Sequence, residues 1–267
     1  MIEINKVKID NIIGKTIPSW KKDVLERDKD KVLLIDGREG SGKSALAMQI
    51  ASGIDPNFDN SKIAFNGEQF MKMVRDPVRR KGDCIVLDEA FGSANSRSVL
   101  TQINKAMVTL ATEMRQLNLF VIIVLPSFFD LDRYFAVWRC DTLIHVYFKK
   151  DGSRGKYMIF PFNAKKNLYI QGKKFYSYGC VKTPYPTQRF NKGYGNIDEE
   201  KYRVDKAVAF RDAKPKEGVV QKRTRERLAV LAIYMKDKMN LTDKEIGDMI
   251  DMSRQSVNVL RNGGIVS

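Results

Sequence analysis

The chain has 267 residues, of which 43% are hydrophobic, so it is long enough for a large α/β domain with its own core and a smaller second domain. Its three cysteines lack a CxxC spacing and His145 is its only histidine, which argues against a disulfide framework and against a zinc site. The longest apolar run, residues 119–125, is far too short to span a bilayer, and the amino terminus lacks a signal-peptide pattern, so we expect a soluble cytoplasmic protein without stable membrane insertion.

The formal net charge of +15 is concentrated in the carboxyl-terminal part of the chain. Residues 149–267 hold 26 Lys and Arg against 13 Asp and Glu, which accounts for most of the surplus. Such a surplus indicates a polyanionic partner, and nucleic acid is the commonest one. The alternative is a solvated surface that only keeps the protein soluble.

Residues 1–30 are predicted to be an amino-terminal extension with a short extended segment, a break at residues 18–20 and a charged stretch. From residue 31 onward, apolar runs and helix-forming segments alternate. The predicted strands cover 31–36, 61–65, 84–88, 119–125 and 141–148, and the predicted helices cover 44–51, 67–74 and 98–117. This alternation predicts an α/β domain over 31–148 with a mainly parallel sheet.

A glycine-rich loop between the first strand and the first helix of this domain predicts a nucleotide site. Residues 37–44 match the pattern GxxxxGK[ST], and glycines in such a loop let backbone N–H groups point at phosphates. Lys43 is expected to reach the β- and γ-phosphates, and the Ser44 hydroxyl is expected to hold Mg²⁺. We therefore expect a P-loop NTPase of the RecA-like type that binds ATP and Mg²⁺. The predicted ATP-binding residues are Gly37, Gly40, Ser41, Gly42, Lys43, Ser44 and Ala45.

Two adjacent carboxylates, Asp88 and Glu89, follow the buried strand 84–88. This strand is predicted to lie beside the P-loop strand and to bring Asp88 to the magnesium ion, while Glu89 orients or deprotonates the attacking water. Glu89 and Lys43 are therefore the predicted catalytic residues. An acid pair of this kind favours ATP hydrolysis coupled to motion over a small-molecule kinase, although Glu89 could also be a surface residue at a strand end.

Residues 31–148 resemble the motor core of the FtsK/HerA superfamily of P-loop ATPases, which includes DNA translocases, genome-packaging ATPases and Zot-like phage proteins. The resemblance rests on residues 37–44, on the strand that ends in Asp88 and Glu89, and on residues 113–124, where an arginine precedes a short turn and a buried strand. In that superfamily this strand usually ends in a polar sensor, commonly Gln or Asn. The corresponding position here is Pro126, so Ser127 becomes the sensor candidate.

The resemblance also implies a homo-oligomeric ring, a hexamer, with ATP between neighbouring subunits. An arginine from one subunit then completes the site of the next, although each candidate could equally be an ordinary surface arginine. The candidates are Arg97, Arg115, Arg133 and Arg139.

Residues 149–217 are predicted to be a basic, aromatic, β-rich extension. Between residues 149 and 197 there are 11 basic residues, one acidic residue and ten Phe or Tyr, broken by glycines and prolines, which is typical of hairpins with a basic face. These aromatic rings could stack on single-stranded nucleic acid or could form a core, and the sequence leaves both open. A charged helix over 198–213 and a linker over 213–218 are expected to follow.

Residues 218–267 are predicted to form a small all-α domain, because residues 241–260 resemble a helix-turn-helix. Thr242 and Glu245 have the spacing of a capping box, and Ser253 can cap a second helix. Exposed residues at the start of that helix would read base edges in the major groove, whereas basic residues on the preceding helix would contact phosphates. The predicted DNA-binding residues are Arg223, Arg225, Arg254, Gln255, Ser256 and Asn258. A helical bundle that contacts another protein is the alternative.

These features together predict an ATP-hydrolysing DNA motor that translocates, packages or transfers the DNA of a mobile element, virus or cell. The alternative is an ATP-regulated DNA-binding or partition protein, in which nucleotide switches assembly and nothing is moved.

Overall fold

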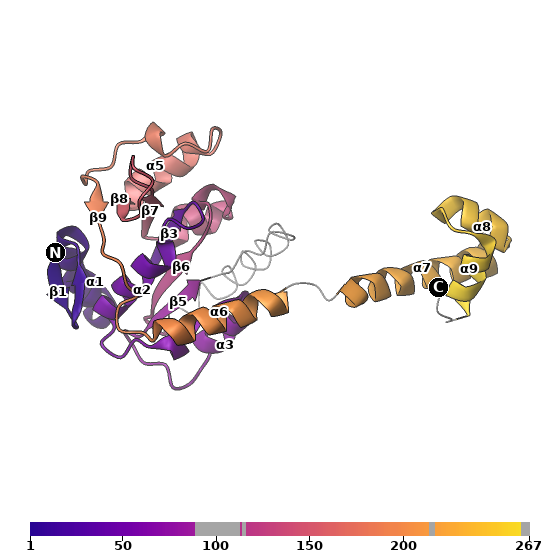
Figure 1. The fold of residues 1–267 in the computed structure, drawn as a ribbon, viewed down its shortest axis with the longest axis horizontal. Coiled ribbons are helices and arrows are strands. Elements are labelled where there is room, and N and C mark those ends of the chain that lie inside the picture. Colours follow the sequence, from indigo (N-terminus) through magenta and orange to yellow (C-terminus); the bar gives the residue numbers. More distant parts are fainter. Residues whose placement is uncertain (89–112, 114–115, 214–216, 263–267) are drawn as a thin grey trace. The chain divides into compact units, whose positions relative to one another are not determined.

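The computed structural model describes residues 1–88, 113, 116–213 and 217–262, with only the backbone described for 212–213 and 217–225. The chain divides into two compact units, which we call the amino-terminal unit (Met1–Arg211) and the carboxyl-terminal unit (Asp212–Ser267). Figure 1 labels their helices and strands. Each unit has its own apolar core, so each is described by itself.

The amino-terminal unit is built on a mostly parallel sheet, which confirms the predicted α/β class. Among the described residues this sheet has seven strands in the order β4-β5-β6-β3-β7-β8-β9. The first five in this order run parallel, and the last two are antiparallel additions at one edge. The strands are β3 (Lys31–Gly37), β4 (Ile63–Ala64), β5 (Cys84–Asp88), β6 (Phe120–Val124), β7 (Thr142–Tyr147), β8 (Lys156–Phe160) and β9 (Gln188–Arg189).

The prediction that the strand ending in Asp88 lies beside the P-loop strand is wrong, because β6 lies between them. In the sheet, Ile122 of β6 is opposite Leu33 of β3 on one side and opposite Val86 of β5 on the other. All three strands are apolar on both faces, so their sequences do not specify which of them are neighbours. The interposed strand ends between Gly37 and Asp88 and leaves a crevice at the carboxyl edge of the sheet, where ligands bind in open α/β sheets.

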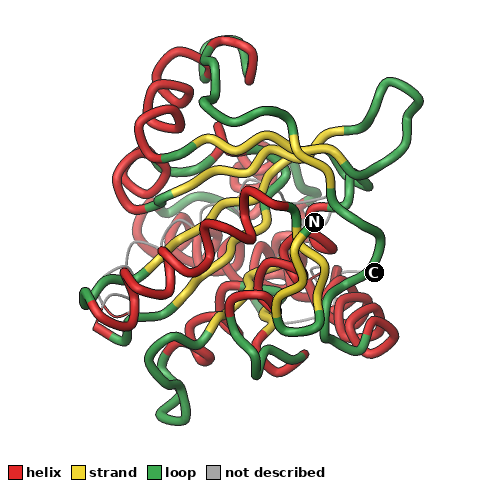
Figure 2. The backbone as a smooth tube through the Cα atoms, turned by 90° about the vertical axis from the view of Figure 1, so that its left-hand side faces the viewer, coloured by secondary structure: helices red, strands yellow, loops and turns green. Residues whose placement is uncertain are grey.

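Helices cover both faces of the sheet (Figure 2). The side chains of each strand alternate between two cores. Leu33 and Ile35 pack on one face, whereas Val32 and Leu34 pack on the other. The first face is covered by β1 (Ile2–Ile4), β2 (Val7–Ile9), α1 (Asn11–Glu26) and α2 (Lys43–Ile54). The second face is covered by α3 (Gly67–Val74), α5 (Phe162–Gly172) and the short helices η2 (Phe128–Asp130) and η3 (Phe135–Arg139).

The predicted break at residues 18–20 is wrong, because α1 continues through Pro18. A proline inside a helix costs about 3 kcal/mol, since it removes one hydrogen bond and crowds the preceding turn. The same helix buries Ile13, Ile17, Trp20 and Val24 against the sheet. Each such side chain contributes about 1.5–3 kcal/mol when buried, so the apolar stripe outweighs the proline.

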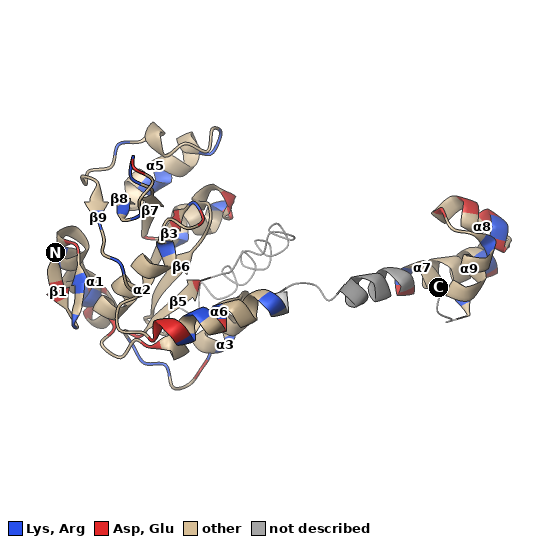
Figure 3. Ribbon diagram, in the orientation of Figure 1, with Lys and Arg blue, Asp and Glu red and all other residues tan. Residues whose placement is uncertain are grey.

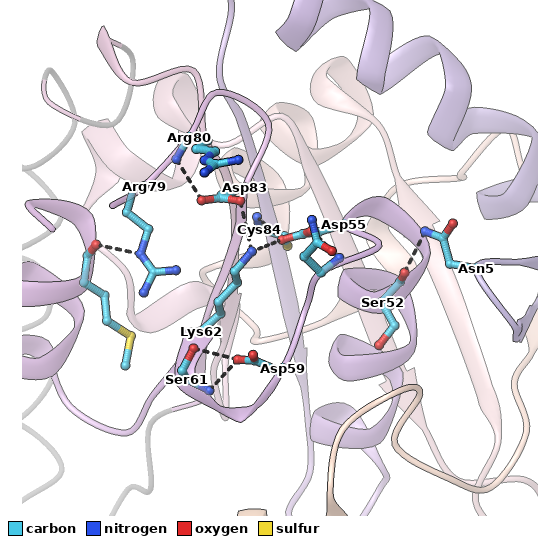
Figure 4. Close-up of polar contacts among 12 residues, drawn as sticks. Asn5, Ser52, Asp55, Asp59, Ser61, Lys62, Arg79, Arg80, Asp83 and Cys84 are labelled. Carbon is cyan, nitrogen blue, oxygen red and sulfur yellow. Dashed lines mark hydrogen bonds and ion pairs between the residues drawn. The ribbon is translucent and has the colours of Figure 1, made fainter. Parts of the chain in front are cut away.

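A buried ion cluster fixes the start of β5 to the end of α2 (Figure 4). The Lys62 ammonium, in the short helix η1 (Asn60–Lys62), donates to Asp55 Oδ2 at 2.6 Å and to Asp83 Oδ1 at 2.9 Å. The Cys84 N–H donates to the same Asp55 oxygen at 3.1 Å. Burial lowers the pKa of Lys62, but its hydrogen bonds to the two carboxylates outweigh burial and raise that pKa overall.

The β-rich prediction for residues 149–217 is wrong in part. Beyond the β7–β8 hairpin, the segment contains the helix α5, the short helix η4 (Tyr178–Cys180) and a strand of only two residues. The aromatic residues suggested strands, but Tyr157, Phe160 and Tyr169 fill the cores, while Phe175 and Tyr176 are exposed. The predicted charged helix is confirmed as α6 (Glu199–Ala213), and the predicted linker lies partly outside the described residues.

The carboxyl-terminal unit consists, in its described part, of α7 (Glu217–Met239), α8 (Asp243–Ile250) and α9 (Arg254–Arg261), which confirms a carboxyl-terminal helical region. Its core contains Ala232, Ile246, Val257 and Leu260. The capping box of Thr242 and Glu245 is present, and Ser253 caps α9. The apolar side chains of Leu231, Ile233 and Met249 are exposed.

We predict that Lys62→Met lowers the free energy of unfolding by about 3 kcal/mol at pH 7, because it leaves the buried Asp55 and the half-buried Asp83 without their cation. Burial raises the pKa of Asp83, but hydrogen bonds from the Arg80 N–H and the Lys62 ammonium lower it overall. The stabilisation is therefore fully present above the pKa that this aspartate has in the unfolded chain. The stabilisation is lost as the pH falls through the lowered pKa of Asp83 in the folded protein. The difference in stability between Lys62→Met and the original protein should then shrink. Denaturant unfolding at pH 7 and pH 3 measures both effects.

The matched control is Lys72→Met. Lys72 pairs with Glu68 on the surface of α3, where both side chains are 75% exposed, so we expect no measurable change. Equal losses for the two variants would contradict the anchoring role of Lys62.

Candidate nucleotide-binding site

The candidate site lies at the carboxyl ends of β3 and β5, on either side of β6. The loop after β3 requires glycine at three positions, since Gly37, Gly40 and Gly42 have φ values of +140°, +74° and +100°. Gly37 is also required by packing, because a Cβ there would lie 2.0 Å from the carbonyl oxygen of Val146 in β7. The loop therefore passes close to the neighbouring strand and ends at Lys43, the first residue of α2.

Lys43 folds back onto this loop. Its ammonium donates to the carbonyl oxygens of Gly37 at 2.6 Å and Arg38 at 2.9 Å. Burial lowers the pKa of Lys43, and the carboxylates of Asp36 and Asp88 oppose that shift. Neutral carbonyl oxygens thus hold the Lys43 ammonium beside the loop. A phosphate oxygen could take their place and would give the ammonium a negatively charged partner.

The structure brings together the two residues that the sequence assigned to Mg²⁺. The Ser44 hydroxyl donates to Asp88 Oδ1 at 3.1 Å, although the two residues lie on α2 and β5. Asp88 is only 1% exposed, so its charge needs partners inside the protein.

Two of those partners come from α6, which the sequence did not assign to the site. The Lys206 ammonium lies 2.8 Å from Asp88 Oδ2, 3.2 Å from Ser44 Oγ and 3.0 Å from the Tyr202 hydroxyl. Tyr202 also donates to Asp88 Oδ2. Burial, followed by the charge of Asp88, raises the pKa of Tyr202 well above its usual range, which keeps the phenol protonated as a donor.

A cavity of about 810 Å³ opens between the loop, the end of β6 and α6, which is a size that suits a nucleotide. Five cationic side chains line it, against the acidic Glu39 and Asp88. Figure 3 shows that α6 carries several basic residues. An excess of positive charge favours a polyanionic ligand. The cationic residues are Lys43, Arg154, Arg203, Lys206 and Arg211.

The residues present fit a magnesium-bound nucleoside triphosphate. The buried Ser41 Oγ has no hydrogen-bond partner in the described part of the chain, which leaves one hydroxyl of the loop unused. The Lys206 ammonium contacts oxygens of both Ser44 and Asp88, so a cation can occupy this position. Hydroxyl and carboxylate oxygens are the donors that Mg²⁺ prefers, and phosphates usually complete its shell. No cluster of three or more His, Cys, Asp and Glu suited to a metal occurs among the described residues.

Other predicted site residues lie elsewhere. Ser127 caps η2 by accepting from the Phe129 N–H, and Leu125 and Pro126 form the cavity wall at the end of β6. Arg139 pairs with Asp30, which precedes β3 and so lies at the opposite end of that strand from the loop. Arg133 is exposed. Glu89, Arg97 and Arg115 lie outside the described residues.

In the carboxyl-terminal unit, the start of α9 has the predicted pattern of exposure. Arg254, Gln255 and Asn258 are exposed, whereas Val257 is buried. Ser256 is half-buried, because its N–H and its hydroxyl both bond to Ser253. Arg223 and Arg225 lie on α7, and their side chains are outside the described part.

No protein-family model, curated protein or solved structure matches this chain. No helix among the described residues is both long and apolar enough to cross a membrane.

We predict that Gly42→Ala weakens nucleotide binding at least about tenfold, because an alanine is strained at φ +100° and its Cβ would meet the Phe190 ring at 2.9 Å. Relief of that strain would turn N–H groups of the loop away from the cavity. Titration with a fluorescent ATP analogue measures the affinity.

Gly152→Ala is the matched control. Gly152 has φ +78° with open space around its Cβ position, so the variant carries similar backbone strain away from the cavity. It should keep the affinity of the original protein, and an equal loss in both variants would mean that general destabilisation causes the effect.

Proposed function

We propose that this chain is an ATP-hydrolysing motor that acts on DNA, in translocation, packaging or transfer. The observation that carries the proposal is the meeting of Ser44 and Asp88 below a glycine-rich loop, 3.1 Å apart and next to Lys43. A hydroxyl from the first turn of a helix and a carboxylate from the end of a buried strand are the protein ligands that P-loop NTPases use for Mg²⁺.

In this proposal each group at the site has its own role. The N–H groups of residues 40–45 and the Lys43 ammonium hold the phosphates, with the amino-terminal end of α2 adding its positive dipole. Ser44 and Asp88 hold Mg²⁺, which would offset the negative charge of the triphosphate when bound. Glu89 follows Asp88 directly and would orient the attacking water and accept its proton.

The DNA part of the proposal rests on the carboxyl-terminal unit. The exposed Arg254 and Gln255 begin α9, which follows α8 after a tight turn. Both side chains can form paired hydrogen bonds with base edges, and basic residues on α7 can contact phosphates. Contact with base edges in a major groove would make double-stranded DNA the partner.

The ring assembly is also part of the proposal and rests on the resemblance to hexameric motors. Among the arginines that could act in a neighbouring site, Arg139 already pairs with Asp30, so the exposed Arg133 is the better candidate within the described residues.

The second candidate is an ATP-regulated DNA-binding or partition protein. The contact of α6 with Asp88 favours it, because α6 is the last helix before the boundary between the two units. Nucleotide binding at Asp88 could therefore change DNA binding without movement. DNA-stimulated turnover that displaces a triplex or a protein roadblock would favour the motor, whereas slow turnover without displacement would favour the switch.

We predict that Lys43→Ala abolishes nucleotide binding, whereas Glu89→Gln keeps binding but lowers the turnover of ATP by about 10²-fold or more. The first change removes the charge that offsets the triphosphate, and the second removes only the base. Binding titrations and phosphate release on the same preparations separate affinity from chemistry. Normal turnover in Glu89→Gln would show that another residue positions the water.

We also predict that Arg254→Ala and Gln255→Ala each reduce the preference for one DNA sequence by about 1–3 kcal/mol. Arg223→Ala and Arg225→Ala should instead weaken all sequences alike and reduce the salt dependence of binding by about one unit of slope per phosphate contact. Titrations on a preferred and a scrambled duplex at several salt concentrations distinguish the two effects.

Lys244→Ala on α8 is the control for loss of one exposed positive charge near α9. If the four other variants also bind both duplexes as the original protein does, the helix-turn-helix interpretation fails, and the unit is better described as a bundle for protein contacts.

A further inference from the structure

We propose that Lys206 competes with the divalent cation for Ser44 and Asp88, so that α6 is latched onto the site without nucleotide and is released when Mg²⁺ and nucleotide bind. This inference rests on the proposed nucleotide site and adds a regulatory element to it.

The competition follows from shared atoms. Lys206 Nζ lies 2.8 Å from Asp88 Oδ2 and 3.2 Å from Ser44 Oγ. These two side chains are also the ones that would hold Mg²⁺. A magnesium ion binds oxygens at about 2.0–2.1 Å and keeps an octahedral shell of waters and phosphate oxygens around itself. An ammonium within hydrogen-bond distance of the same oxygens occupies that shell and repels the ion, so the two cations exclude each other.

Beside the contact of Lys206 with Ser44, two polar contacts of α6 at this site meet on one oxygen atom. Tyr202 donates to Asp88 Oδ2, and Lys206 donates to the same atom and to the Tyr202 hydroxyl. A cation that takes Asp88 Oδ2 therefore breaks both hydrogen bonds at once. The latch is a pair of contacts that is made or lost together.

Few other side chains hold α6 in place. Tyr202 is buried and Ala209 is partly buried against the core, but Val204 is 60% exposed and Val208 is 44% exposed. Arg203 pairs with Glu199 within the same helix. A helix with so few apolar contacts depends on its polar ones, and local opening is expected in regions of this kind.

The place of α6 in the chain gives its release a consequence. The boundary between the two compact units falls after Arg211, in the last turns of this helix. Release of α6 would therefore free the end of the amino-terminal unit at its boundary with the carboxyl-terminal unit.

The test uses the full chain with Lys206→Gln and the matched control Lys201→Gln, which removes an exposed charge from the same helix outside the cavity. Hydrogen exchange of residues 199–211 reports the latch, and titration of a fluorescent ADP analogue at several Mg²⁺ concentrations reports the competition. In the original protein, exchange in α6 should rise when Mg²⁺ and the ADP analogue are both added.

Lys206→Gln should show the raised exchange without nucleotide, and the Mg²⁺ concentration for half-maximal binding of the analogue should fall about tenfold. Lys201→Gln should behave as the original protein in both measurements. Tyr202→Phe, which changes no charge, should raise exchange in α6 and serves as a second variant if Lys206→Gln does not fold.

Three results would overturn the proposal. Weaker binding of the magnesium-bound analogue to Lys206→Gln would mean that Lys206 contacts phosphate rather than competing with the metal. Unchanged exchange in α6 when the analogue is bound would mean that the helix is not released. If the original protein binds no analogue at any Mg²⁺ concentration, the proposed nucleotide site itself is wrong and the competition falls with it, which distinguishes that failure from the first two.

Discussion

The buried carboxylate of Asp88 is the constraint on which the rest of the site depends. A carboxylate that is 1% exposed is costly unless charged and hydrogen-bonded groups surround it. This one is surrounded by a hydroxyl from α2 and by a phenol and an ammonium from α6, so it holds together parts of the chain that are more than 100 residues apart. Any ligand that takes Asp88 must replace these partners, and the position of α6 therefore depends on what the carboxylate binds.

Asp36, at the end of β3, shows what a permanently satisfied carboxylate looks like in the same sheet. It is fully buried, it accepts from the Phe128 N–H at 2.8 Å and lies 2.9 Å from His145 Nδ1, and Tyr178 donates to it as well. One of these partners, Phe128, is itself buried, whereas His145 and Tyr178 are half-buried. Asp88 differs in that an ammonium, that of the half-buried Lys206 on α6, is among its partners, and another cation could replace this group.

The sequence predicted the parts of the site that lie close together in the chain. The loop at residues 37–44 and the acid after the strand 84–88 are local patterns with a direct physical reason, and the capping box at Thr242 is another. The order of the strands could not be predicted, because strands that are apolar on both faces do not identify their neighbours. The contact of Lys206 with Asp88 could not be predicted either, since no periodicity links residues separated by 118 positions. The helix α5 was missed because its aromatic residues were taken as a sign of strands.

The strength of the α6 contact sets how tightly a ligand must bind to release this helix. Hydrogen bonds to a charged group contribute about 1.5–3 kcal/mol each, so the two bonds to Asp88 would hold α6 with about 3–6 kcal/mol. A ligand must bind the released form roughly 10²- to 10⁴-fold more tightly to make the two forms equally populated, and about 10²-fold more tightly still to shift the equilibrium fully. Loss of the γ-phosphate and the ion would let Lys206 return. A latch of moderate strength therefore suits repeated release and return of α6, which a motor and a nucleotide-regulated switch would both require.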